Sequence, residues 1–319
     1  MAISAQQSEA TRLPVGFNSK PKVSIGMPVY NGARYLRTAL DSVLGQNYKN
    51  LELVICDNAS TDHTEDICRA YADQDSRVRY FRSPVNHGIT WNFRQVVLRS
   101  SAEFFLWVAH DDVLAPEYVQ RCLEVLERDP GLVLCYSAGL NIDEDGNRTP
   151  HDELPARIGS PEAHIRFRDL IRMNHMCEPI FGVIRADVLR KTSIHGDFPD
   201  SDRCVLAELA LHGPFHRVSE PLFFHREHLG RTTRQFASRQ QRLASIHPGR
   251  EPRFVFPHFR QFWEYLRAIH RAPLNWRQRL LCHLEMLRWV RDNAGRLLND
   301  LKFVAYQICR PFRVALDAR

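Results

Sequence analysis

The sequence predicts an α/β fold in which helices cover both faces of a mainly parallel sheet. Apolar runs typical of strands alternate with segments whose apolar residues recur every three or four positions, the spacing of amphipathic helices. The strand runs are apolar almost throughout, as expected of parallel strands that are buried on both faces. The alternation begins near residue 22 and continues to about residue 140.

Each expected element in this part of the chain has its own local pattern. Apolar runs predict strands at 22–30, 51–57, 77–83, 103–109 and 131–139. The 3/4 spacing predicts helices at 33–46, 60–74, 89–101 and 116–129. The second helix opens with Ser, Thr and Asp, which cap helices, and the fourth opens with proline, which suits a first turn.

The second half of the chain has a looser pattern. A turn at 143–147 is followed by a mixed region that contains a helix at 202–213 and two short strand-like runs within 215–228. From about residue 259 the chain becomes helical, and apolar residues at 3/4 spacing are separated by arginines. Such an amphipathic, basic helix can lie in a bilayer interface or pack on the protein body or a dimer partner.

The charge is unevenly distributed. The net charge is +6, but residues 226–319 hold 19 Lys and Arg against 7 Asp and Glu, and the remainder holds 24 against 30. This asymmetry indicates that the basic end meets a membrane surface, nucleic acid or another anionic partner, unless it is only a solvated helical face. We expect the membrane surface rather than nucleic acid.

The cysteines and the apolar runs predict the compartment. The eight cysteines form no C-x-x-C pair and several lie in apolar segments, as buried thiols of a reducing compartment do. Residues 1–21 are polar, aperiodic and without the apolar core of a secretory signal. No run has the length of a transmembrane helix. We expect a cytoplasmic protein, with peripheral attachment at the inner face of the cell membrane left open.

Several common nucleotide and metal motifs are absent. No G-x-G-x-x-G follows the first strand, which argues against a dinucleotide-binding dehydrogenase. No Gly-Lys pair occurs, so there is no P-loop, and no H-E-x-x-H occurs.

Polar residues follow three of the expected strands, at the sheet edge where ligands of such folds bind. Tyr30 and Asn31 lie at the end of the first strand, and an aromatic ring there can stack on a base or lie on the surface of a turn. Asp57 ends the second strand, too far ahead of its helix for plain capping to explain it. Asp111 and Asp112 follow the fourth; two successive acids suit Mg²⁺ or Mn²⁺, and helix capping is the alternative for one of them.

Three stretches together resemble the inverting family 2 glycosyltransferases. These stretches are VSIGMPVYNGARYLRTALDSVLGQNYKNLELVICDNASTD, NHGITWNFRQVV and FFLWVAHDDVLAPEYV. The resemblance extends over residues 22–230 and implies the GT-A fold, a Rossmann-like sheet, with a nucleotide-diphospho-sugar as donor. It divides the chain into a flexible start (1–21), a catalytic domain (22–230, with its nucleotide half at 22–112 and its acceptor half at 113–230) and a basic helical region (231–319).

The resemblance also implies roles for single residues. Donor binding falls to Pro28, Val29, Tyr30, Asn31, Asp57, Asn58, Asn86, Gly88, Asp111 and Arg226. Asp57 is the expected acceptor of a base N–H. One of Asp111 and Asp112 holds the metal and the other the ribose, and either assignment stays open; many members have D-x-D-D where this chain has Ala109 and His110 before the two acids. Arg226 or His228 neutralises the diphosphate or completes the metal shell.

The remaining group is a base for the acceptor hydroxyl. In SDRCVLAELALHGPF, Asp202 lies 11 residues before Gly213, as the catalytic Asp of the family does. Ser201 replaces the family's Glu, Asp200 is the rival base, and plain helix capping is the alternative role for Asp202. The implied reaction is metal-dependent, inverting sugar transfer to a glycan or lipid-linked acceptor in bacterial surface polysaccharide synthesis. A sugar-nucleotidyltransferase and a non-catalytic membrane-docking protein with a relic fold are the alternatives.

Overall fold

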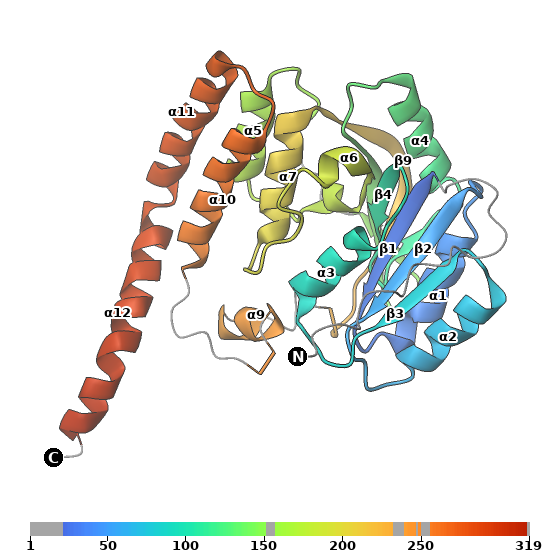
Figure 1. Ribbon diagram of the computed structural model, residues 1–319, viewed down its shortest axis with the longest axis horizontal. Coiled ribbons are helices and arrows are strands. Elements are labelled where there is room, and N and C mark those ends of the chain that lie inside the picture. Colours follow the sequence, from blue (N-terminus) through green and yellow to red (C-terminus); the bar gives the residue numbers. More distant parts are fainter. Residues whose placement is uncertain (1–21, 151–156, 232–238, 247, 250–255, 318–319) are drawn as a thin grey trace, which may run out of the picture.

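The computed structural model describes residues 22–150, 157–231, 239–246, 248–249 and 256–317. The expected flexible start, residues 1–21, lies outside the described residues. The described part forms a sheet flanked by helices, and two long helices run along one side of the molecule (Figure 1).

The described residues form one sheet of nine strands, in the order β3-β2-β1-β4-β8-β6-β9-β5, with β7 paired to β6. The strands are β1 Val23–Val29, β2 Leu51–Asp57, β3 Val78–Arg82, β4 Phe104–Trp107, β5 Val113–Leu114, β6 Leu134–Ile142, β7 Arg148–Pro150, β8 Val183–Arg185 and β9 Phe215–Arg226. All the strands expected from the sequence up to residue 139 are present.

The sheet is parallel in its first half and mixed in its second. Strands β3, β2, β1 and β4 are parallel, and every residue of β1 and β2 is buried. Strand β8 is antiparallel to both β4 and β6, whereas β6 and β9 are parallel. The carboxyl ends of β1, β2 and β4 therefore meet at one edge, where a ligand site is expected.

The expectation of two short strands within 215–228 is wrong, because one strand, β9, runs from Phe215 to Arg226. Its pairing with β6 is irregular around Ala138, which lies opposite Pro221. Proline has no amide hydrogen for the ladder and interrupts the apolar pattern, so one irregular strand has the sequence pattern of two short ones.

The helices follow the expected alternation and continue to the C-terminus. They are α1 Ala33–Leu44, α2 Thr64–Gln74, α3 Ile89–Leu98, α4 Tyr118–Arg128, α5 Ala163–Arg172, the 3₁₀ turn η1 Glu178–Phe181, α6 Ala186–Leu189, α7 Ser201–His212, α9 Arg239–Ile246, α10 Pro257–Arg271, α11 Trp276–Asp292 and α12 Ala294–Asp317.

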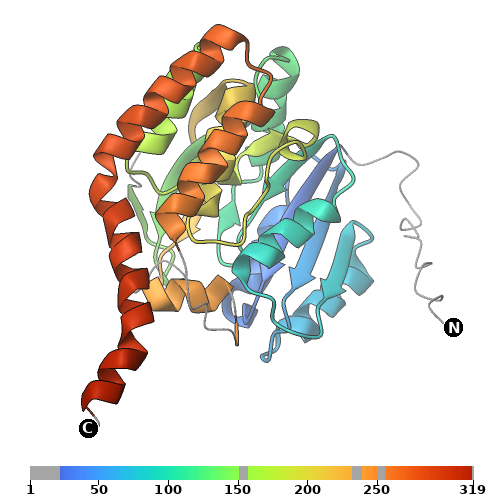
Figure 2. The ribbon, with the colours of Figure 1, turned by 60° about the vertical axis from the view of Figure 1, so that its left-hand side comes forward.

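Two apolar layers hold helices to the two faces of the sheet. Leu36 of α1, Ile67 of α2 and Leu123 of α4 belong to the layer on one face. On the other face α3, α5 and α7 pack together with the C-terminal helices, and Tyr265 of α10 and Trp289 of α11 are buried there. Figure 2 shows α10 and α11 lying over this second layer.

The C-terminal helices are joined to the body by an ion pair to a buried carboxylate as well as by apolar packing. Arg271 of α10 donates from Nε to Glu208 of α7 at 2.6 Å and from Nη2 at 2.8 Å, and the Glu208 side chain is 1% exposed. The division of the chain at residue 230 stays a prediction. None of the helices that the structure describes combines the length and the apolar character required to cross a membrane.

Candidate active site

The loops after β1 and β2 are locked together at the expected edge of the sheet. The amide of Asn31 donates to Ser60 Oγ at 2.9 Å, and the amide of Thr61 donates to Asn31 Oδ1 at 2.8 Å. Asp62 accepts from the amides of Ala33 and Thr64, each at 3.0 Å, so it caps the starts of both α1 and α2. This agrees with the capping role expected of the polar residues that open the second helix. Tyr30 is left 44% exposed at the end of β1, with a ring face available to a ligand.

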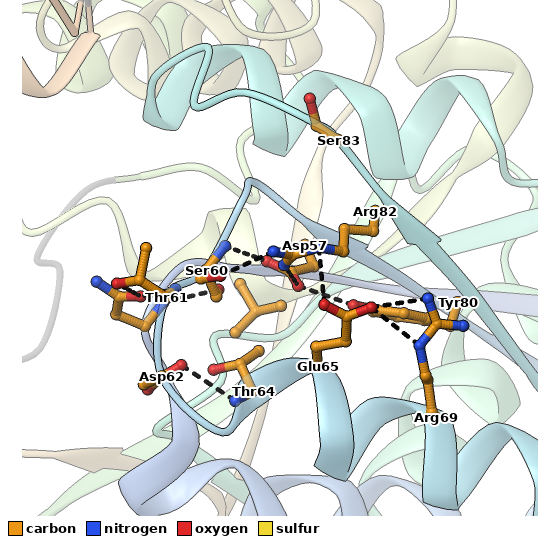
Figure 3. A network of polar contacts seen from close by, with 12 residues as sticks. Asp57, Ser60, Thr61, Asp62, Thr64, Glu65, Arg69, Tyr80, Arg82 and Ser83 are labelled. Carbon is orange, nitrogen blue, oxygen red and sulfur yellow. Dashed lines mark hydrogen bonds and ion pairs between the residues drawn. The ribbon is translucent and has the colours of Figure 1, made fainter.

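Asp57 has a different environment, shown in Figure 3. Its side chain is fully buried and accepts hydrogen bonds from the Ser60 amide at 2.8 Å, the Tyr80 hydroxyl at 2.8 Å and Arg82 Nη1 at 2.6 Å. Arg82 is only partly buried and also pairs with Glu65 at 3.0 Å. The guanidinium therefore lies between the buried carboxylate and solvent, where it can donate to a ligand.

The sequence did not predict roles for Tyr80 and Arg82. The parallel pairing of β2 and β3 places Arg82 opposite Asp57, and Tyr80, two residues earlier, is on the same face of β3. Burial, together with the Asp57 carboxylate, raises the pKa of the Tyr80 phenol, so this hydroxyl stays protonated and donates. One feature of the sequence could have indicated them. The polar residues Tyr80 and Arg82 alternate along β3, and the neighbouring strand β2 ends in an acid.

Asn58 holds the N-x-G loop expected near the donor. Its Nδ2 donates to Asn86 Oδ1 at 2.8 Å and to the Gly88 carbonyl at 3.1 Å, and its Oδ1 accepts from the His87 amide at 3.0 Å. Asn58 is buried, so it acts as an anchor for this loop. Asn92, which the sequence did not predict, donates to the carbonyls of Val29 and Cys56 at the ends of β1 and β2.

Gly88 is the one glycine of the site whose conformation excludes a side chain. Its φ is +92°, and a Cβ built on it would lie 2.0 Å from the carbonyl oxygen of Ile246, the last residue of α9. Helix α9 therefore packs directly on the loop at the start of α3. In Figure 1 α9 is drawn beside α3, between the sheet and α12.

Asp111 and Asp112 come from the tight turn after β4 and face β9. The His228 Nε2 atom lies 2.8 Å from Asp111 Oδ2, and the Arg226 amide donates to Asp112 Oδ1 at 2.9 Å. Burial alone would raise the pKa of the Asp111 carboxyl, but the imidazoles of His110 and His228 outweigh it and lower that pKa. Asp112 does not cap α4, whose N-terminal flanking residue is Glu117, so the capping alternative is wrong for this acid.

The Arg226 guanidinium places positive charge beside the two acids. Its Nε donates to the Asp111 carbonyl at 3.0 Å, and the guanidinium lies over the Tyr35 ring with 4.8 Å to the centroid. The His228 ring contacts Tyr35 from another side, with ring centroids 4.8 Å apart. Arg226, His228 and Asp111 thus meet around one tyrosine of α1.

His110 packs on the turn between β1 and α1. A Cβ built on Gly32 would lie 2.5 Å from His110 Cδ2, so the imidazole occupies the space above this glycine. The ring joins the turn after β4 to the turn after β1, and its proximity lowers the pKa of Asp111. His110 therefore contacts the candidate site through Gly32, a contact that the sequence did not predict.

Asp202 lies in the first turn of α7, after the N-cap residue Asp200, and its carboxylate satisfies one backbone amide of this turn, so the capping alternative stays open beside the catalytic role. Asp202 is partly exposed and accepts from the Arg203 amide at 2.8 Å. Burial and the nearby Asp200 carboxylate raise the pKa of the Asp202 carboxyl. Ser201 is buried, and its Oγ lies 3.2 Å from His195 Nδ1.

His195 connects this helix start to the end of β4. Its ring lies edge-on to Trp107 and Phe93, with centroids 5.3 Å and 5.1 Å apart. Because Trp107 ends β4 and Ser201 begins α7, the start of α7 lies at the same edge of the sheet as the two acids after β4. Burial lowers the pKa of His195 to about 4, so this imidazole is neutral near pH 7.

Backbone strain gathers at the same edge. Five residues other than glycine adopt positive φ in the described part of the chain, and three of them, Asn31, Ala59 and Asp200, lie in the loops just described. A fourth, Cys177, is close enough to Asp202 for its thiol to affect that carboxyl. Sparsely populated backbone conformations persist where the surrounding structure demands them, which is common at functional sites.

The side chains at this edge could supply only some of the ligands of a hard divalent cation. Among the residues that the structure describes, no three His, Cys, Asp or Glu side chains converge as a metal cluster. Asp111 and Asp112 offer carboxylate oxygens, and Mg²⁺ is commonly held by one or two carboxylates with substrate phosphates and water. The residues present therefore fit a cation that binds together with a phosphorylated ligand.

A mainly parallel sheet with polar loops at the carboxyl ends of β1, β2 and β4 is the architecture of α/β proteins that bind ligands at one edge of the sheet. Comparison with known families identifies the family within this class. Residues 24–192 match the model of glycosyl transferase family 2. The chain belongs to this family.

Curated relatives match part of the chain. An uncharacterised glycosyltransferase of Rickettsia felis is 35% identical over 161 residues, 49% of this chain and 26% of the relative. One from Rickettsia typhi is 37% identical over 39% of this chain and 38% of the relative. The hyaluronan synthase of Pasteurella multocida is 33% identical over 41% of this chain and 13% of its own length. The matches thus span well under half of these relatives.

Solved structures share the fold over most of the chain. S. aureus TarS 1–349 in complex with UDP-GlcNAc has a TM-score of 0.62 at 15% identity, covering 90% of this chain and 81% of TarS 1–349. The mannosyltransferase PcManGT of Pyrobaculum calidifontis, in complex with GDP-Man and Mn²⁺, has a TM-score of 0.54 at 15% identity, covering 94% and 80%. The expected GT-A fold is thereby confirmed.

Proposed function

We propose that this protein transfers a sugar from a nucleotide-diphospho-sugar to an acceptor hydroxyl with inversion at the anomeric carbon. The observation that carries the proposal is the joint position of Asp57, the two acids after β4 and Asp202 at one edge of the sheet. Family membership and the nucleotide-sugars named in the TarS and PcManGT complexes support it.

In this proposal the loops after β1, β2 and β3 hold the nucleotide. Pro28, Val29, Tyr30 and Asn31 line the base pocket, and the exposed Tyr30 ring offers a stacking face. Arg82, held by the buried Asp57, would offer a donor to the edge of a base, and Asp57 would accept a base N–H once Arg82 turns away from its Oδ2 atom. Asn58 fixes the loop of Asn86 and Gly88 against the donor.

The acids after β4 take the ribose and the cation, Mg²⁺ or Mn²⁺. One of Asp111 and Asp112 would hold the cation, with His228 beside it, the other would hold the ribose, and Arg226 would face the diphosphate. When bound there, the cation would stabilise negative charge on the departing diphosphate. We expect cation binding to depend on the donor, because one carboxylate leaves most of the coordination shell to phosphates and water.

The transfer is a single displacement in which Asp202 is the base. Its carboxylate takes the proton of the acceptor hydroxyl as that oxygen bonds to the anomeric carbon, and the bond from this carbon to the diphosphate breaks with the electron pair leaving on the diphosphate. A raised pKa suits this role, because a general base works best when its pKa approaches the working pH.

The acceptor class is proposed from the relatives. The matched hyaluronan and chondroitin synthases build polysaccharides, as their names state, so we propose a growing glycan or a lipid-linked glycan as acceptor. The protein would act at the cytoplasmic side of a bacterial membrane, in surface polysaccharide synthesis. The family match favours transfer over the nucleotidyltransferase alternative.

A thermal-shift screen of UDP-, dTDP- and GDP-sugars, each with and without Mn²⁺, tests the donor proposal. We expect one base class to raise the melting temperature, and to do so more with Mn²⁺ than without. Transfer to a glycan acceptor with that donor, followed by NMR of the new anomeric proton, tests inversion. If no nucleotide-sugar stabilises the protein or is consumed, the proposal fails.

A further inference from the structure

Helix α11 has apolar side chains on two opposite sides. Cys282, Met286 and Trp289 are buried against the body. On the other side Trp276, Leu280, Leu284 and Leu287 are between 43% and 78% exposed. At 3.6 residues per turn these four residues fall within an arc of about 80°. A helix needs only one apolar face to pack on its own domain, so the outer face is left without a partner in the described chain.

The outer face continues along α12. Leu298 and Leu301 are about half exposed, whereas Val304 and Asp300 of the same helix are buried toward the body. Figures 1 and 2 both show α11 and α12 following each other as one long rod along the side of the molecule. We call the six exposed residues of this rod the outer stripe, which consists of Trp276, Leu280, Leu284, Leu287, Leu298 and Leu301.

The charge beside the outer stripe is positive. Arg277, Arg288 and Arg291 lie within or next to the arc on α11, and Lys302 follows Leu301 on α12. The two acids of α11 are outnumbered by their cations: Glu285 is buried and bonded by Arg288 at 2.7 Å, and Asp292 is bonded by both Arg172 at 2.7 Å and Arg291 at 3.0 Å. Arg277 is exposed and makes no ion pair among the described residues.

We infer that the outer stripe is a docking surface for an anionic lipid bilayer. Leucine and tryptophan side chains flanked by arginine suit the boundary between acyl chains and anionic headgroups, because the rings and leucines enter the apolar layer and the cations meet the headgroups. A second copy of this chain fits less well. If two such stripes paired about a twofold axis, the arginines of one chain would lie close to the arginines of the other, and these like charges would repel each other.

This surface would also set the orientation of the candidate active site. Helix α9 packs on Gly88 at the edge of the sheet where β1 and β2 end, and both views show α12 running past α9 beyond the body. A rod that lies on the bilayer would therefore hold this edge near the headgroups. The inference does not rest on the proposed reaction, since it concerns only the outer stripe and its charges.

Vesicle sedimentation of the full chain tests the inference. We expect the protein to bind vesicles of phosphatidylcholine with 30% phosphatidylglycerol and to bind pure phosphatidylcholine at least tenfold more weakly. Binding should fall when the salt concentration rises from 50 mM to 500 mM, because salt screens the headgroup attraction. The double variant Leu280→Glu, Leu287→Glu should bind anionic vesicles at least tenfold more weakly than wild type.

The matched control is Leu98→Glu, which changes an equally exposed leucine at the end of α3 and should bind as wild type does. Circular dichroism and melting temperature verify that each variant is folded. The inference is overturned if wild type ignores anionic vesicles, if the double variant binds them as wild type does, or if neutral vesicles bind equally well. A wild-type dimer in light scattering that the double variant makes monomeric, without vesicle binding, would identify a second copy as the occupant.

Discussion

Asp57 and Asp202 are two carboxylates at one edge of the sheet with opposite surroundings. Asp57 is fully buried and accepts from an amide, a phenol and a guanidinium, so its charge is compensated in three directions. Asp202 is only partly exposed and accepts from one neighbouring amide, and burial together with the second carboxylate, Asp200, raises its pKa. The first arrangement stabilises a fixed negative charge, and the second favours taking up a proton.

This contrast separates a recognition carboxylate from a reactive one. A fully compensated carboxylate costs little to keep charged and holds its geometry, which suits selection of a nucleotide base. A carboxylate with few donors and a raised pKa gains more from accepting a proton, which suits a general base. The predictions below test this division of roles, from the largest expected effect to the smallest.

Replacing the reactive carboxylate should have the largest effect. We expect Asp202→Asn to lower kcat by about 10² to 10⁴-fold, the usual contribution of a positioned base, with little change in donor affinity. The melting temperature near pH 7 should stay the same or rise, because the variant removes a charge whose burial is unfavourable. Steady-state kinetics and thermal melts measure both quantities.

Asp200→Asn is the control for Asp202, since it removes the rival carboxylate and leaves Asp202 in place. It should also lower the pKa of Asp202, because one of the two causes that raise that pKa is the Asp200 charge. The acidic limb of the rate profile should then move to lower pH while kcat at pH 7 is largely kept. Loss of transfer in Asp200→Asn but not in Asp202→Asn would reverse the assignment.

Removing the cation that pairs with Asp57 should mainly affect donor binding and the stability of the fold. Arg82→Gln leaves the buried Asp57 without its cation, and we expect about 2 kcal/mol of destabilisation, less than for a wholly buried pair because Arg82 is 29% exposed. Donor KM should rise by about tenfold while kcat changes little. Urea unfolding and donor titration measure these effects, and Arg121→Gln, which breaks the exposed pairs with Glu124 and Glu220 away from this network, is the control.

A methyl group at Gly88 tests the loop that carries the donor. In Gly88→Ala the alanine would have to adopt a positive φ, and its methyl group would collide with the Ile246 carbonyl. We therefore expect the free energy of unfolding to fall by about 1 to 3 kcal/mol and the donor KM to rise. Gly146→Ala is closely matched, with φ of +88° against +92° but nothing within 4 Å of its Cβ. If both variants bind donor as wild type does, the contact between α9 and this loop is unimportant for binding.

The smallest effect should come from the buried imidazole that links α7 to β4. The pKa of His195 is lowered from 6.5 to about 4, so the unfolded chain takes up a proton there at a pH at which the folded chain does not. The free energy of unfolding should therefore fall as the pH drops from 6.5 toward 4, by about 1 kcal/mol for the first pH unit. In His195→Gln this part of the pH dependence should be absent from urea unfolding curves.

Much of the first half of the fold could be predicted from the sequence, because buried parallel strands and amphipathic helices have distinct periods. The strands from β1 to β4 and helices α1 to α4 lie within a few residues of their expected positions. Strand β9 was harder, since Pro221 and an irregular register interrupt its pattern. Helix α9 has few apolar residues and was not expected.

The residues of the candidate site that could be predicted are those that lie at or just after the end of a single strand. Asp57, Asp111 and Asp112 are recognisable because an acid after an apolar run is unusual. Tyr80 and Arg82 were not, because their meeting with Asp57 depends on the register between two strands. The contact of His110 with Gly32 and that of α9 with Gly88 join segments far apart in the sequence, and only tertiary packing brings them together.

The ion pair between Glu208 and Arg271 has a consequence for the way the protein unfolds. It ties the helix that carries Asp202 to α10, in the same apolar layer as Tyr265 and Trp289. A fragment ending at residue 230 would keep a carboxylate in an apolar layer without its cation and would expose the surface that α10 covers. Helix α7 and the C-terminal helices should therefore melt in a single cooperative transition, and such a fragment should aggregate rather than persist as a smaller enzyme.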